Sequence, residues 1–140
     1  MDKRELILAA MEKLPYAYAP YSHFHVAAAL LGNSGAVYTG VNVENASYPA
    51  GLCAERAALA MAVSGGERAF SAIAIGGGRD GNITDYCAPC GICRQALREF
   101  VKPEHFLVIL FKSPEDYKEY TLEELLPESF GPANLREIKE

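Results

Sequence analysis

The fold of this chain depends on two stretches of sequence, Cys53-Ala54-Glu55-Arg56 and Pro89-Cys90-Gly91-Ile92-Cys93. Each comes just before a run of apolar residues with helical spacing, which predicts helices over about residues 53–64 and 90–100. Zinc binds thiolates in a tetrahedron, and a catalytic zinc site leaves one of its positions open for water. The predicted ligands are Cys53, Cys90 and Cys93. Glu55 is too close to Cys53 to be a further ligand, but it is placed to reach the open position.

The predicted zinc site carries excess negative charge, because three thiolates outweigh the charge of the metal. Cys53 and Cys90 each begin a predicted helix, so the positive helix ends face the sulfurs. Arg56 is expected to donate hydrogen bonds to a thiolate and to neutralise part of the charge. Arg94 is a second candidate, although a solvated position on the helix is favoured for it. Glu55 is predicted to take a proton from water at the zinc and to pass it on, as general base and then acid.

Cys87 introduces an alternative, because Cys87-Ala88-Pro89-Cys90 is a second Cys-x-x-Cys motif. A closed site of four cysteines would hold zinc for structure and would leave no position for water. Cys87 comes before Pro89 and outside the predicted helix, so we expect it to be a small free thiol. A structural zinc site also has no use for the carboxylate of Glu55.

The order of predicted elements indicates an α/β protein with a mixed sheet between helices. Residues 2–14 have apolar side chains at helical spacing, with Asp2 as the N-cap and Pro15 as the stop. A hairpin follows, with strands over residues 24–31 and 36–43. Further predicted elements are a flexible glycine-rich loop at residues 77–82, a short helix at 123–126, a tail at 127–140 and strands at 69–76, 106–111 and 118–121. Because no linker or repeat interrupts this order, residues 1–140 are predicted to form a single domain.

Asn42 and Glu44 are predicted to bind a sugar, because an amide and a carboxylate at a strand end suit paired hydroxyl groups. Residues two apart on a strand share a face, so both side chains are expected to point the same way. A polar turn after an edge strand explains the same two residues and stays open as an alternative.

Charge and hydropathy limit the partners of the chain. The net charge is −5 and no cluster of Lys and Arg is present, which argues against a polymeric nucleic acid. No apolar run reaches the ~20 residues that span a bilayer, and the first residues lack the pattern of a signal peptide. Four cysteines, three of them within residues 87–93, make a poor disulfide framework. We therefore expect a cytoplasmic, metal-binding protein that acts on a small molecule, with no membrane partner.

The ordered set of motifs resembles the zinc-dependent cytidine deaminase family. The resemblance covers nearly the whole chain and is carried by the two zinc motifs with Arg94-Gln95 and by Pro20-Tyr21-Ser22-His23-Phe24, Tyr38-Thr39-Gly40-Val41-Asn42-Val43-Glu44-Asn45-Ala46-Ser47-Tyr48 and Leu125-Leu126-Pro127-Glu128-Ser129-Phe130-Gly131-Pro132. It implies a three-layer α-β-α sandwich with a mixed five-stranded sheet. It also implies a homotetramer with one zinc ion per subunit, as in the small type of the family.

The resemblance also gives roles to individual residues. Zinc would bind to Cys53, Cys90 and Cys93, and Glu55 would shuttle protons. The implied substrate contacts are Phe24 on the base, Asn42 and Glu44 on the ribose, Tyr48 and Phe130 as groups that close the site, and Ala54. Phe130 would come from a neighbouring subunit. The chain departs from the family pattern at Ala27, where glycine is usual, and at Cys87.

We therefore expect hydrolytic deamination of cytidine and 2′-deoxycytidine to uridine and deoxyuridine, in pyrimidine salvage. A blasticidin S deaminase is the near alternative, because it shares the zinc motifs and the fold. Those enzymes lack the Asn-x-Glu-Asn-Ala-Ser run that residues 42–47 contain, which favours a nucleoside. A zinc-stabilised interaction module without activity is the alternative of a different class, and Glu55 argues against it.

Overall fold

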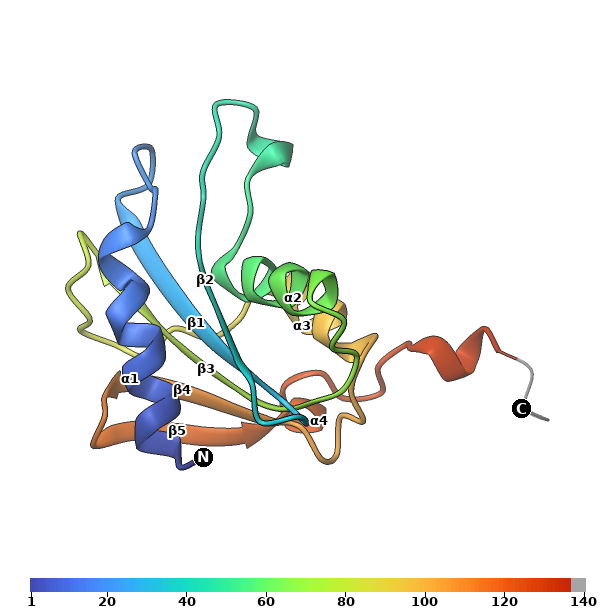
Figure 1. The fold of residues 1–140 in the computed structure, drawn as a ribbon. Coiled ribbons are helices and arrows are strands. Elements are labelled where there is room, and N and C mark those ends of the chain that lie inside the picture. The colour runs from blue at the N-terminus through green and yellow to red at the C-terminus, as the bar shows by residue number, and fades with distance from the viewer. Residues whose placement is uncertain (137–140) are drawn as a thin grey trace.

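The computed structural model describes residues 1–136, which contain a five-stranded mixed sheet in the order β2-β1-β3-β4-β5 (Figure 1). The strands are β1 (Phe24–Gly32), β2 (Val37–Val41), β3 (Phe70–Arg79), β4 (Leu107–Ser113) and β5 (Asp116–Thr121). Strands β3 and β4 run parallel to each other, and the other neighbouring pairs are antiparallel. The mixed five-stranded sheet expected from the sequence is confirmed.

Helices cover both faces of the sheet (Figure 1). They are α1 (Lys3–Lys13), α2 (Ala54–Ser64), α3 (Gly91–Arg98) and α4 (Leu122–Leu125), with 3₁₀ turns η1 (Leu14–Tyr16), η2 (Tyr48–Ala50) and η3 (Pro132–Asn134). Helix α1 lies on one face and α2 and α3 on the other, which gives the predicted three layers. Asp2 caps α1 as expected, since its carboxylate accepts the N–H of Glu5 at 2.8 Å. Within residues 1–136, no helix has both the length and the apolar character needed to cross a bilayer.

The interior strand β4 contributes to the core on both sides of the sheet. Val108 and Leu110 pack in the cluster that includes residues of α2 and α3. Ile109 and Phe111 pack in the cluster that includes residues of α1. The apolar run without alternation therefore forms a strand buried on both faces, as predicted.

A glycine in β2 fixes the start of α2 against the hairpin. A Cβ added at Gly40 would clash with the carbonyl oxygen of Ala54 and the backbone nitrogen of Ala58. Only glycine permits this close approach of strand and helix. The contact holds the first turn of α2, which carries Glu55, at a fixed place beside β2.

Several predicted boundaries differ from the structure by one to three residues, and those of β3 and β2 change the assignment of a predicted loop and of a site segment. Strand β3 continues to Arg79, so the first half of the predicted loop at residues 77–82 is strand. Gly77 pairs with β1, where a Cβ would clash with the carbonyl oxygen of His25, so this glycine serves close strand packing rather than flexibility. Strand β2 ends at Val41, two residues earlier than expected. The last part of the predicted tail, residues 137–140, lies outside the described residues.

Candidate active site

Two helices begin at cysteines, as the sequence predicted. Cys53 is the N-cap of α2 and Cys90 is the N-cap of α3, and neither side chain makes a capping hydrogen bond. The first N–H groups of each helix carry partial positive charge and have no partner within the helix. Both sulfurs therefore lie at positions where a thiolate is electrostatically favoured.

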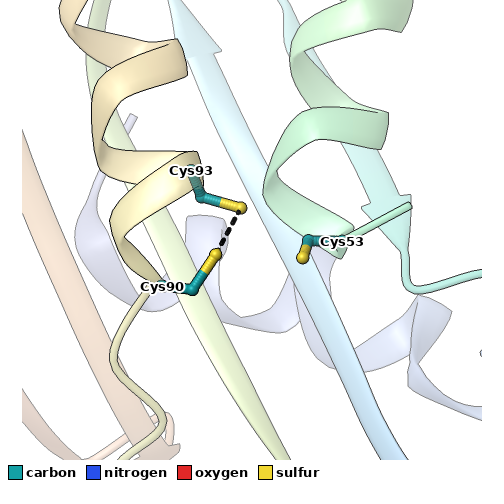
Figure 2. A group of neighbouring side chains, drawn as sticks. All are labelled: Cys53, Cys90 and Cys93. Atoms are coloured by element: carbon teal, nitrogen blue, oxygen red, sulfur yellow. Dashed lines mark hydrogen bonds between the residues drawn. The ribbon is translucent and has the colours of Figure 1, made fainter. Parts of the chain in front are cut away.

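The sulfurs of Cys53, Cys90 and Cys93 lie within 4.8 Å of one another, in the space between the first turns of α2 and α3 (Figure 2). The Sγ atoms of Cys90 and Cys93 are 3.5 Å apart. Among residues 1–136, these three side chains form the group whose ligand atoms lie close enough together to hold a metal ion. Cys87 does not belong to this group. Three thiols at this spacing match the donor set that zinc prefers.

The three sulfurs are partly shielded from water and have a positively charged side chain beside them. Cys93 is buried, and this burial raises the pKa of its thiol. Arg56 lies beside the group, with Nη2 3.7 Å from the Sγ of Cys53. Its Nε is buried and makes no hydrogen bond to the residues that the structure describes. The guanidinium is thus held at the sulfurs, where the sequence analysis expected it.

Glu55 is buried at the same place. Its exposed fraction is 5%, which is rare for a carboxylate. Burial is the largest cause of the raised pKa of this carboxyl. A buried carboxyl beside a group of thiols has no evident value for stability, since burial of an unpaired charge costs free energy. The position is typical of a group that exchanges protons with a bound molecule.

Glu55, Cys53 and Cys90 line a small cavity of about 180 Å³. Its lining residues are Val26, Asn42, Cys53, Ala54, Glu55, Cys87, Ala88 and Cys90. The fold thus brings together five of the predicted site residues from the hairpin and both helices. Val26, Cys87 and Ala88 had not been predicted to line it. Val26 has the same alternation on β1 as Phe24, and that period of two is the signal that could have found it.

Asn42 and Glu44 are not on one strand, and they line different cavities. The amide of Asn42 donates to the carbonyl of Phe24 at 2.8 Å and accepts the N–H of Val26 at 2.9 Å. Glu44 lines a second cavity of about 410 Å³, together with Tyr21, Ser22, Asn45, Tyr48 and Gly51. Both residues follow the end of β2, in a segment where Val43 forms backbone bridges to Tyr18 and Leu52.

The carboxylate of Glu44 is held by the loop that precedes β1. Its Oε1 accepts the N–H groups of Tyr21 at 3.0 Å and Ser22 at 3.1 Å, and its Oε2 accepts the hydroxyl of Ser22. The hydroxyl bond is the largest cause of the lowered pKa of Glu44. No local sequence pattern marks Ser22, because its partner lies 22 positions away along the chain.

The aromatic residues predicted to contact substrate are exposed. Phe24, at the start of β1, has an exposed fraction of 42%, and Tyr48 has one of 78%. Phe130 is 57% exposed, and its carbonyl accepts a hydrogen bond from Gln95 at 2.9 Å. It belongs to the segment between α4 and η3, which extends from the body of the fold (Figure 1). There it lines a different cavity, together with Gln95 and Glu99. Phe130 is therefore not among the residues that line the cavity of Glu55.

Comparison with known proteins identifies the family. The family model described as "Cytidine and deoxycytidylate deaminase zinc-binding region" matches residues 1–109. The chain belongs to the cytidine and deoxycytidylate deaminase family. A protein of Sporosarcina psychrophila named cytidine deaminase is 40% identical over 135 residues, which cover 96% of each chain.

Solved structures of this family have the same fold. The crystal structure of cytidine deaminase from Burkholderia pseudomallei is 44% identical, with a TM-score of 0.83 over 93% of this chain and 100% of that chain. The structure of cytidine deaminase from Mycobacterium leprae is 36% identical, with a TM-score of 0.75 over 91% of this chain and 99% of that chain. The chain is thus an enzyme of the deaminase family, and its α/β fold is confirmed. The matched zinc-binding region contains the cysteine group, so family and geometry agree on a metal site.

Proposed function

We propose that this enzyme deaminates cytidine and 2′-deoxycytidine by hydrolysis, giving uridine and deoxyuridine. The observation that carries the proposal is the cavity in which buried Glu55 meets Asn42 and two cysteines of the metal-binding group. The names of the relatives support a nucleoside as the substrate. A zinc-stabilised module without activity would give no reason to bury Glu55.

The proposed zinc ligands are Cys53, Cys90 and Cys93, with one ion per subunit. Zinc, when bound, supplies a Lewis acid that activates water at neutral pH. The helix ends and Arg56 oppose the negative charge of the three thiolates. Cys87 is proposed to stay outside the ligand set as a free thiol, since its sulfur does not lie with the other three.

Glu55 is the proposed proton carrier. Its carboxylate takes a proton from the attacking water and delivers it to the ring nitrogen of the base. The second proton of that water then reaches the departing amine, so that cytidine and water become uridine and ammonia. The burial of Glu55 supports this role, because a carboxyl shielded from bulk water exchanges protons with the bound substrate rather than with solvent.

The proposed substrate contacts lie in the two cavities that contain Glu55 and Glu44 and on exposed aromatic side chains. Glu44 and Asn42 are proposed to bind sugar hydroxyl groups, and both side chains are oriented by backbone hydrogen bonds. Ala54 lines the cavity beside Glu55, and Phe24 is exposed at the start of β1, where it could stack on the base. Tyr48 packs edge-on against Tyr21, with ring centroids 6.3 Å apart, and both line the cavity of Glu44.

We also propose a homotetramer in which Phe130 closes the site of a neighbouring subunit. Its exposure, and its position in a cavity other than the one that Glu55 lines, support this arrangement. Light scattering should give the mass of four subunits, and Phe130→Ala should weaken substrate use without loss of zinc. The proposed compartment is the cytoplasm, because free thiols that bind metal need reducing surroundings.

The experiment that tests the function follows the ultraviolet absorbance of cytidine with purified, zinc-loaded enzyme, and of blasticidin S in a parallel cuvette. We expect loss of the cytidine band. Metal analysis should show that Glu55→Ala and the isosteric Glu55→Gln keep zinc. Their turnover should fall by ~10²–10⁴-fold. Near-normal turnover in either variant would remove Glu55 from the mechanism. Reaction with blasticidin S alone would keep the zinc chemistry and reject the nucleoside.

A further inference from the structure

Ser22 connects two of the proposed substrate contacts. Its hydroxyl donates to Oε2 of Glu44, and its Oγ accepts the N–H of Phe24 at 3.0 Å. Its own N–H, together with that of Tyr21, donates to Oε1 of Glu44. Both carboxylate oxygens are therefore oriented by one short loop, and the same serine is tied to the first residue of β1.

The Glu44 carboxylate is oriented at a cavity rather than buried in the core. Glu44 and Ser22 both line the cavity of about 410 Å³, so a bound molecule can reach them. A carboxylate offers about four acceptor positions, and three N–H or O–H donors occupy only part of them. The remaining capacity is available to donors from a ligand, and sugar hydroxyl groups are such donors.

The loop itself is held in a rare conformation. His23, between Ser22 and Phe24, has a φ of 61°, which is uncommon for a residue other than glycine. Its N–H donates to the carbonyl of Ala19 at 2.9 Å, and its carbonyl accepts the N–H of Asp80 at 2.7 Å. Such strain persists where the surrounding structure over-determines it. The hydroxyl of Ser22 is thus presented to Glu44 from a rigid backbone.

We propose that Ser22 is a positioning residue for sugar recognition, whose hydroxyl holds the Glu44 carboxylate in the orientation that accepts hydrogen bonds from the sugar hydroxyls of the nucleoside. The inference rests on the proposed function, because it takes Glu44 to be a sugar contact. The lowered pKa of Glu44 agrees with it, since an ionised carboxylate only accepts hydrogen bonds. Ser22 acts through Glu44 and touches no reacting atom.

Steady-state kinetics with two substrates test the proposal. Cytidine carries the sugar hydroxyls, and 2′,3′-dideoxycytidine lacks two of them. We expect Ser22→Ala to raise the KM for cytidine by ~10-fold with kcat within about twofold, because a hydrogen bond to a charged group is lost while two N–H donors remain. The kinetics with dideoxycytidine should change by less than about twofold. Ser34→Ala is the matched control, since it removes the same hydroxyl at the other end of β1 and should alter neither substrate.

Two further variants separate positioning from a structural role. Ser22→Thr keeps the hydroxyl and should restore the KM for cytidine, and it remains informative if Ser22→Ala does not fold. In a Glu44→Ala background, Ser22→Ala should add less than about twofold, because the two changes remove one interaction. Equal losses with both substrates, or an unchanged KM for cytidine, would overturn the inference. Wild-type enzyme inactive on both compounds would overturn the proposed function and the inference with it.

Discussion

Two serine–carboxylate clusters stand at opposite ends of β1 and share one local pattern. Ser22 precedes β1 and binds Glu44, while Ser34 follows β1 and binds Glu67. In each cluster the N–H and the hydroxyl of the serine both donate to the carboxylate. The N–H two residues on donates to the serine Oγ, from Phe24 at 3.0 Å in one cluster and from Ala36 at 3.3 Å in the other.

The clusters differ in what else the carboxylate contacts. Glu67 accepts a further hydrogen bond from the hydroxyl of Tyr38 at 3.0 Å and lies against Gly32, so it closes the turn of the hairpin. Glu44 instead faces the cavity lined by Tyr21 and Tyr48. The same local chemistry therefore stabilises a turn at one end and leaves a carboxylate available to a ligand at the other. The cavity, and not the local hydrogen-bond pattern, distinguishes the Glu44 cluster, which is the one proposed to bind substrate.

The largest expected effect is the difference in kcat/KM between two variants that carry the same substitution, one in each cluster. Glu44→Gln should lower kcat/KM for cytidine on the order of 100-fold, because the amide cannot accept hydrogen bonds on both sides. Glu67→Gln should leave kcat/KM within about twofold. Initial rates at cytidine concentrations well below KM give this ratio directly. Equal losses in the two variants would mean that Glu44 also serves only the fold.

A second, smaller effect concerns stability in acid. The pKa values of Glu44 and Glu67 are both lowered, chiefly by the hydroxyls of Ser22 and Ser34. A carboxyl with a lowered folded-state pKa stabilises the fold above its ordinary pKa of 4.5 and loses that contribution as the pH falls through the folded-state value. The Tm gap between wild type and Glu67→Gln should be present at neutral pH and close below about pH 4.5.

The comparison between variants removes the contribution of other groups to this measurement. Protonation of the metal-binding thiols also destabilises the protein in acid, but it does so in wild type and variant alike. Glu44→Gln should show a closing gap as well, since a serine N–H and a serine hydroxyl donate to each carboxylate. A gap that stays constant from pH 7 to pH 3 would show that the carboxylates contribute nothing to stability through their ionisation.

The contrast also shows what could be predicted from the sequence. The cysteines that begin two helices, and the strand β4 buried on both faces, follow from local spacing and were predicted. The end of β2 and the continuation of β3 through Gly77 depend on pairing with distant strands, and both were wrong. No local pattern marks Ser22, because its bonds to Glu44 form only after the loop before β1 meets the segment after β2.

The smallest expected effect tests whether Glu67 needs its third hydrogen-bond donor, the hydroxyl of Tyr38. Tyr38→Phe removes one hydroxyl donor from the Glu67 cluster and leaves both bonds from Ser34 in place. We expect a Tm below that of wild type but above that of Glu67→Gln, with unchanged kinetics, because the remaining donors still orient the carboxylate. Differential scanning calorimetry at pH 7 measures the order of the three proteins. If Tyr38→Phe were as unstable as Glu67→Gln, Tyr38 rather than Ser34 would hold the turn, and the likeness between the two clusters would be one of geometry without shared energetics.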